Sequence, residues 1–86
     1  MATVRLNKEN NFRANVTATQ ATIKFLVQGS TADCLVYMPA GGPLLGQQNG
    51  VTAGNIGTVG GAIVGNGIQV QINPMDPKLG NATVTY

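Results

Sequence analysis

The sequence predicts an all-β fold: one small sandwich or jelly-roll-like barrel of seven or eight short, mostly antiparallel strands, with no substantial helix. Apolar and polar residues alternate along most of the first half of the chain, which is typical of half-buried strands. Turn-forming residues recur at intervals of roughly ten residues, as they do in sandwiches and barrels. Because 86 residues supply only one small core, we expect residues 1–86 to form a single domain.

The first three expected strands lie in residues 2–6, 12–18 and 21–27. Their apolar positions are even-numbered in the second strand and odd-numbered in the third, so the inward face changes around Thr19-Gln20. A tight turn between two strands or a bulge in one long strand would produce this change. We expect a bulge or a bent strand, because Thr-Gln lacks the residues that tolerate positive φ.

Glycines in the segment 54–74 follow a G-x-x-x-G spacing that three structures could explain. A membrane helix needs about 20 predominantly apolar residues, but this stretch is rich in Gly, Asn and Thr. A phosphate-binding loop would be followed by a Lys and a helix, whereas the strand-like sequence IQVQI follows here. We therefore predict a β-hairpin that turns at Asn66-Gly67, and Asn49-Gly50 gives a second hairpin signal.

Two further strands complete the expected fold. A short, fully apolar strand is expected at 34–38, before the break at 39–43, and a last alternating strand at 81–86. The only cysteine, Cys34, lies in the first of these strands. We expect it to be a small buried core thiol, and a single cysteine excludes a disulfide within the chain.

The composition argues against catalysis. The chain has no histidine, one cysteine and three carboxylates. Neither a Ser-His-Asp nor a Cys-His constellation can form within one chain, and ligands for zinc or iron are nearly absent. We therefore expect a protein that is not an enzyme and holds no metal or other cofactor. Catalysis would need sites shared between subunits.

Charge is distributed unevenly along the sequence. Charged residues make up 9% of the chain, against roughly a quarter in ordinary soluble domains, and none occurs from Cys34 to Met75. The net charge of +2 gives no strong nucleic-acid signal, and the first residues lack the apolar segment of a secretory signal. A free monomer normally keeps charge on its surface, so the uncharged half predicts contact with another chain.

These features predict a structural protein that self-assembles as a homo-oligomer or docks onto a larger protein lattice. A coat or decoration component of a virus particle has this general make-up, so a virion or phage capsid is one setting that fits. The predicted interface consists of apolar and aromatic residues in or beside the uncharged segment: Tyr37, Leu44, Leu45, Val59, Ile63 and Tyr86.

Three other interpretations remain open. Abundant Asn, Thr and Gln would suit a lectin-like module that binds carbohydrate, with Tyr37 or Tyr86 as the aromatic platform. The low-charge windows GGAIVG and IQVQI would suit a β-fibril. Arg5, Arg13 and Lys24 would suit a basic face for an anionic partner, but we expect an ordinary solvated face, because cations there also discourage edge-to-edge strand pairing.

Overall fold

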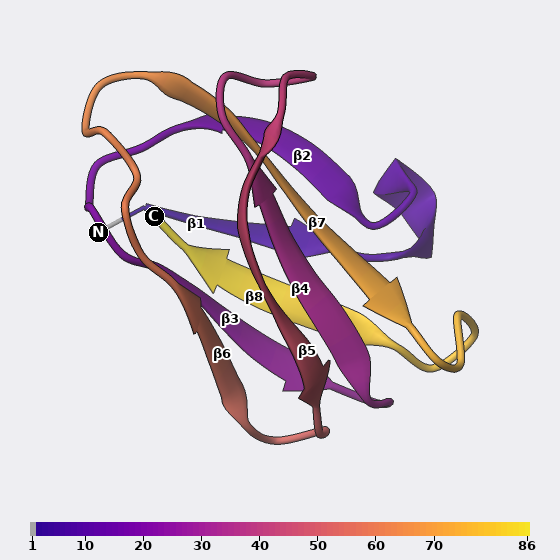
Figure 1. Ribbon diagram of the computed structural model, residues 1–86. Coiled ribbons are helices and arrows are strands. Elements are labelled where there is room, and N and C mark those ends of the chain that lie inside the picture. Colours follow the sequence, from indigo (N-terminus) through magenta and orange to yellow (C-terminus); the bar gives the residue numbers. More distant parts are fainter. Residues whose placement is uncertain (1) are drawn as a thin grey trace.

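The computed structural model describes residues 2–86 and contains two four-stranded antiparallel sheets packed face to face (Figure 1). In chain order, the elements are β1 (Thr3–Leu6), η1 (Lys8–Asn10), β2 (Arg13–Thr17), β3 (Ile23–Gln28), β4 (Ala32–Tyr37), β5 (Leu44–Val51), β6 (Ile56–Val59), β7 (Gly67–Pro74) and β8 (Asn81–Thr85). Sheet A has the spatial order β1-β8-β3-β6, and sheet B has the order β2-β7-β4-β5. The predicted all-β sandwich is confirmed.

Strand pairing is nested along the chain. The first strand pairs with the last, β2 with β7, β3 with β6 and β4 with β5. Two further pairs, β3 with β8 and β4 with β7, join these hairpin-like ladders into the two sheets. This order is that of a jelly roll, in which one long hairpin is rolled into two layers. The sheets keep separate edges, so the molecule is a sandwich and not a closed barrel.

The core lies between the central strands of the two sheets. Alternate residues of β3 and β7 point inward, and none of them is more than 1% exposed: Ile23, Phe25, Val27, Ile68, Val70 and Ile72. Burying each of these side chains contributes about 1.5–3 kcal/mol. The alternation seen in the sequence therefore reports directly which face of each central strand meets the opposite sheet.

The connection between β2 and β3 differs from the prediction. It is not a bulge in one long strand: β2 belongs to sheet B, β3 belongs to sheet A, and residues 18–22 cross between them. Ala18 is buried at 1% exposure within this crossing, and its N–H donates to the carbonyl of Asn66 at 3.1 Å. The inward-facing parity changes because the chain changes sheets.

Both predicted Asn-Gly hairpins were wrong. Asn66-Gly67 lies where the loop from β6 enters β7, and these two strands belong to different sheets and do not pair. Asn49-Gly50 lies inside β5, where Gly50 has φ +67° and the β4–β5 register shifts. An Asn-Gly pair indicates only that the backbone can adopt positive φ. Both bulges and turns need such residues, so the pair does not by itself identify a hairpin turn.

Glycines allow the two sheets to approach closely along the side formed by β5 and β6. A Cβ on Gly57 would lie 2.9 Å from Val51 Cγ2 and 3.0 Å from Cys34 Sγ, and one on Gly46 would lie 2.9 Å from Val59 Cγ1. The side chain of Gln48 on β5 bridges to β6, where its Oε1 accepts from the N–H of Thr58 at 2.7 Å. Thus Gln48 occupies a donor that would otherwise be free at the edge of sheet A.

The only helical segment among residues 2–86 is the single turn η1. No helix in this part of the chain has the length and apolar character needed to cross a membrane.

Candidate functional site

The loops divide the sandwich into two chemically different ends (Figure 1). Loops 18–22, 38–43 and 60–66 lie at one end with the C-terminal residue Tyr86, and are held together by hydrogen bonds such as Ala62 N–H to Ala21 O at 3.0 Å. The opposite end carries loops 7–12, 29–31, 52–55 and 75–80. Of the eight charged side chains, all but Lys24 lie within two residues of loops at this second end. We call the two regions the apolar end and the charged end.

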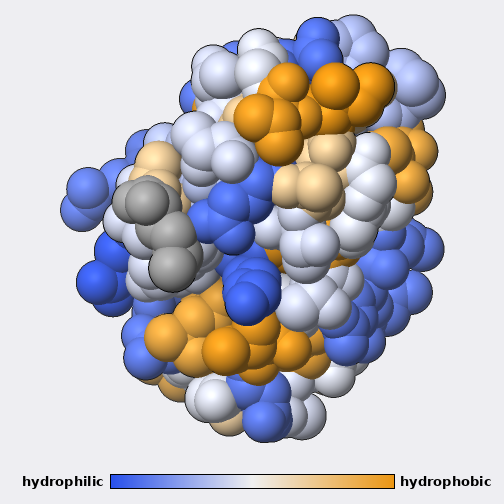
Figure 2. All heavy atoms as spheres, turned by 90° about the vertical axis from the view of Figure 1, so that its left-hand side faces the viewer, coloured by the Kyte–Doolittle hydropathy of each residue, from blue (hydrophilic) through white to orange (hydrophobic). Residues whose placement is uncertain are grey.

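Two exposed aliphatic side chains lie in a loop of the apolar end, whereas Met75 and Leu79, which are 81% and 62% exposed, lie in loop 75–80 at the charged end. Ile63 and Val64, in the loop between β6 and β7, are each 58% exposed. Beneath them, the N–H of Ile63 contacts Met38 Sδ at 3.5 Å, and Leu45 packs against the core beside the same loop. Figure 2 shows two separate orange patches, and the upper one lies toward the end where Figure 1 places these loops. The result is an apolar surface with no ionised side chain in its loops.

The backbone of loop 60–66 is fixed by the crossing segment 18–22. The N–H of Gly65 donates to Ala18 O at 2.8 Å, and the N–H of Ala62 is bonded to the same segment. Ala62 takes the inward position at 6% exposure. Because the small residue fills the space below the loop, the larger Ile63 and Val64 side chains are left facing solvent.

The structure places the six predicted interface residues in different environments. Leu45 and Ile63 belong to the apolar end, while Tyr86 is half-buried at the end of the chain and packs against the core. Tyr37 and Leu44 are paired in register on β4 and β5. Val59 is only 4% exposed and belongs to the core, so it offers no surface contact.

Sequence reasoning missed Met38 and Val64 as parts of this surface. Val64 follows Ile63 in the same uncharged run, so a wider selection of that run would have included it. Met38 lies just beyond β4 in an irregular loop that opens with the cis Met38–Pro39 peptide. No periodic pattern marks a residue in such a loop.

The outward face of sheet B is rich in amides around one aromatic ring. The strand registers align Asn15, Gln69, Tyr37 and Leu44 in one row across the sheet. The adjacent row contains Arg13, Gln71, Leu35 and Gln47. Tyr37 is therefore flanked by amides on an almost uncharged face.

The cations expected on outward strand faces are divided between the sheets. Arg5 and Lys24 lie on sheet A, whose outward face also carries threonines, and Arg13 lies on sheet B. A single basic face made from these three residues is therefore absent. Instead, Arg5 lies beside Lys8 and Lys78 along an open cleft at the charged end.

The carboxylates and the thiol occupy structural positions. Asp33 Oδ1 accepts from the N–H of Gly50 at 2.8 Å, and Asp76 Oδ1 accepts from the N–H of Lys78 at 3.0 Å. Cys34 is fully buried, as predicted. Burial, and secondarily the Asp33 carboxylate, raises the pKa of the Cys34 thiol to about 12. Among residues 2–86, no three His, Cys, Asp or Glu side chains form a potential metal site.

Comparisons of the chain with protein-family models, with curated proteins and with solved structures found no match. Any functional argument therefore depends on the surfaces described above. Of these, the apolar end combines the largest exposed aliphatic side chains of the uncharged loops with a rigidly held backbone.

Proposed function

We propose that this protein is a non-enzymatic structural subunit that associates with further copies of itself through the apolar end. The observation that carries the proposal is the exposure of Ile63 and Val64, each 58% accessible on a loop without ionised side chains. Complete burial of a fully exposed aliphatic side chain of this size contributes about 1.5–3 kcal/mol, and Ile63 and Val64 still have 58% of their surface to bury. A partner surface over both residues would therefore contribute substantially to association.

A second copy of the chain suits this surface for an electrostatic reason. The protein has a net charge of +2, and its cations lie mainly at the charged end. Two copies that meet through their apolar ends keep those cations far apart, so association avoids like-charge repulsion. An interface between identical patches is also the usual arrangement in a two-fold symmetric dimer.

The wider setting is proposed by analogy of fold. Jelly rolls occur in viral capsid proteins as well as in lectins, and a fold alone does not choose between these functions. A subunit that is added to a virus particle or another protein lattice agrees with the small size and the uncharged loops. In that setting, the apolar end would contact the lattice or neighbouring copies.

Sedimentation equilibrium over a range of protein concentrations tests the proposal. We expect wild-type protein to associate at low micromolar concentration and Ile63→Lys to weaken association by at least about tenfold, because the new charge must be desolvated. Met75→Lys is the matched control: it adds the same charge at an 81% exposed apolar residue of the charged end. A wild-type monomer, or equal weakening by both changes, would contradict the proposal.

Carbohydrate binding is a second candidate function, favoured by the amide-rich face around Tyr37. Gln69 is paired in register with Tyr37, and Gln71 lies in the next row. Amides can bond to sugar hydroxyls while an aromatic ring packs on the apolar side of a sugar. Saturable, sugar-inhibitable binding on a glycan array that is lost in Tyr37→Ala, and kept in Tyr86→Ala, would support this alternative.

The fibril alternative has less support. The sequence GGAIVG forms the fixed loop between β6 and β7, and IQVQI lies in β7, which is paired on both sides by β2 and β4. Neither window provides a free strand edge in the folded domain. A fibre-diffraction pattern with cross-β spacings from folded protein would be needed to favour it.

A further inference from the structure

An open cleft of about 380 Å³ lies at the charged end, between η1 and the loop 75–80. Arg5, Lys8 and Lys78 line it, and these are three of the five cationic side chains in the protein. Glu9 is the one carboxylate among the lining residues. Three positive charges less one negative charge leave +2 along the cleft, which equals the net charge of the whole chain.

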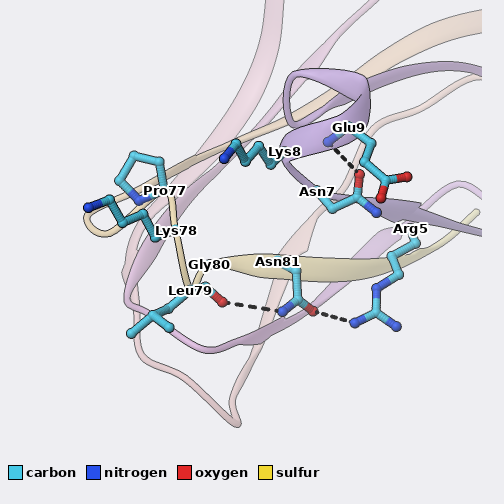
Figure 3. Close-up of a pocket in the computed structure, with 9 residues that line it drawn as sticks. All are labelled: Arg5, Asn7, Lys8, Glu9, Pro77, Lys78, Leu79, Gly80 and Asn81. Atoms are coloured by element: carbon cyan, nitrogen blue, oxygen red, sulfur yellow. Dashed lines mark hydrogen bonds between the residues drawn. The ribbon is translucent and has the colours of Figure 1, made fainter.

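The cationic groups are spread along the cleft and do not converge on one point (Figure 3). The Arg5 guanidinium donates through Nη2 to Asn81 Oδ1 at 3.3 Å, which is a bond to a neutral group. This is the only side-chain hydrogen bond made by the three cations within residues 2–86. Within the described residues no ion pair engages these cations, so they are available to an anionic ligand.

The walls of the cleft are held by backbone and amide hydrogen bonds. On one side, Asn7 Oδ1 accepts from the N–H of Glu9 at 3.0 Å, and Asn10 Oδ1 accepts from the N–H of Asn7 at 2.9 Å. The chain then leaves η1 through Asn11 and Phe12, which have φ values of 57° and 59°. Two consecutive non-glycine residues in this region cost of order 1–3 kcal/mol each, so the surrounding structure must hold this wall in place.

The opposite wall is equally well anchored. The carbonyl of Asp76 accepts from the N–H groups of Leu79 at 3.2 Å and Gly80 at 2.8 Å. The N–H of Asp76 donates to Ser30 Oγ at 2.9 Å, which ties the turn to the neighbouring loop. The cleft is therefore already formed, and a ligand would not have to order either wall.

We propose that this cleft binds an acidic peptide segment of a partner protein. Separated cations fit the separated carboxylates of an extended chain better than they fit one compact anion. Pro77 and Leu79 line the same cleft, and Leu79 is 62% exposed, so apolar side chains between the carboxylates also find a contact. This assignment is independent of association through the apolar end.

Nucleic acid fits the cleft less well. Proteins that grip nucleic-acid backbones use a longer row of cations, and those that hold single strands add aromatic stacking platforms. No aromatic residue is among those that line this cleft, and only three cations line it. The observations therefore favour carboxylates carried on a peptide.

Fluorescence anisotropy with a labelled hexaglutamate peptide tests this assignment on the full chain. We expect binding that weakens as salt is added. Arg5→Gln, Lys8→Gln and Lys78→Gln should each weaken binding about two- to fivefold, as exposed charge contacts do, and the triple variant should abolish it. The changes are at exposed or partly exposed positions, so thermal unfolding should show that each variant remains folded.

The matched control is the double variant Arg13→Gln, Lys24→Gln, which removes two cations that do not line the cleft. Its affinity for hexaglutamate should change less than twofold. Equal weakening by this variant and by a pair of cleft changes would overturn the assignment, because net charge alone would then explain binding. Absence of binding at low ionic strength, or tighter binding of a thymidine hexanucleotide under the same conditions, would also overturn it.

Discussion

The apolar end and the charged end are both built from short loops between strands of the same two sheets, yet only the loops of the charged end carry charged side chains. At the apolar end, Ile63 and Val64 are exposed and the loops contain no charge. At the charged end, three cations line an open cleft. This fold therefore converts a separation of charge along the sequence into a separation between two ends of the molecule.

Nested strand pairing explains this conversion. The uncharged run 34–75 contributes strands to both sheets, so it does not occupy one half of the molecule. The charged segments at the beginning and end of the chain are brought together because β1 pairs with β8. Their charged residues then meet in or beside loops 7–12 and 75–80, which leaves the loops of the opposite end without charged side chains.

Lysine substitutions should have very different effects on folding in the core and at the exposed apolar end, and this difference should be the greatest of those tested. Val59→Lys should abolish folding, because it places an unpaired charge at a position that is 4% exposed. Ile63→Lys, four residues later, should leave the thermal unfolding midpoint nearly unchanged, because Ile63 is exposed. Circular dichroism and thermal melts measure both variants. A folded Val59→Lys protein would show that β6 does not place this residue in the core.

The next largest effect on stability is expected from alanine substitutions at two glycines, one from each end of the molecule. Gly29 and Gly41 have φ values of +78° and +76°, so an Ala at either position adopts an unfavourable backbone conformation at a cost of about 1–2 kcal/mol. A Cβ on Gly29 would lie 1.8 Å from Leu79 O, whereas nothing lies within 4 Å of one on Gly41.

Gly29→Ala should therefore lower the free energy of unfolding by at least about 2 kcal/mol more than Gly41→Ala, through the steric clash in addition to the φ cost. Urea denaturation of both variants measures the difference. Equal losses would mean that loop 29–31 can move away from loop 75–80 at little cost.

A smaller effect on the free energy of unfolding is expected from the Cys34 thiol, which lies in the core between the two ends. Because the pKa of the Cys34 thiol is raised from 9.0 to about 12 in the folded state, the folded protein holds this proton more tightly than the unfolded chain does. The resulting stability is fully present below pH 9, and is lost as the pH rises toward 12.

We expect the free energy of unfolding to fall more steeply above pH 9 in wild type than in Cys34→Ala, which lacks this thiol. Urea denaturation at a series of alkaline pH values measures this difference, and the variant corrects for other groups that titrate there. Parallel pH profiles would indicate that the thiol is reached by solvent in the folded state.

The smallest effect is expected at Arg13, an exposed cation on the outward face of sheet B. Arg13→Ser should change the free energy of unfolding by no more than about 0.5 kcal/mol and leave association unchanged. The same melts and sedimentation runs measure both quantities. A large loss of either would mean that sheet B is an interaction surface, and would weaken the contrast between the two ends.

The sequence predicted the strand class and much of the core because these depend on local alternation. Inward residues of β3 and β7 alternate with neighbours that are polar apart from Leu26, so their burial could be read from the sequence. Strand partners depend on contacts between distant segments. The Asn66-Gly67 signal was therefore misread as a hairpin, although β6 and β7 lie in different sheets.

The surfaces were harder to predict for the same reason. Val59 and Ile63 belong to one uncharged run without alternation, and only the end of β6 at Val59 separates the buried residue from the exposed one. The cleft at the charged end joins Arg5 to Lys78, which are far apart in sequence. No local spacing could indicate that contact.

Amide hydrogen exchange as a function of protein concentration tests the claim that copies of the chain associate through the apolar end. If the apolar end is the surface that another copy covers, exchange in loop 60–66 should slow as concentration rises, while exchange in loop 75–80 at the charged end stays constant. Exchange that is independent of concentration in loop 60–66, or protection that appears only at the charged end, would contradict the claim.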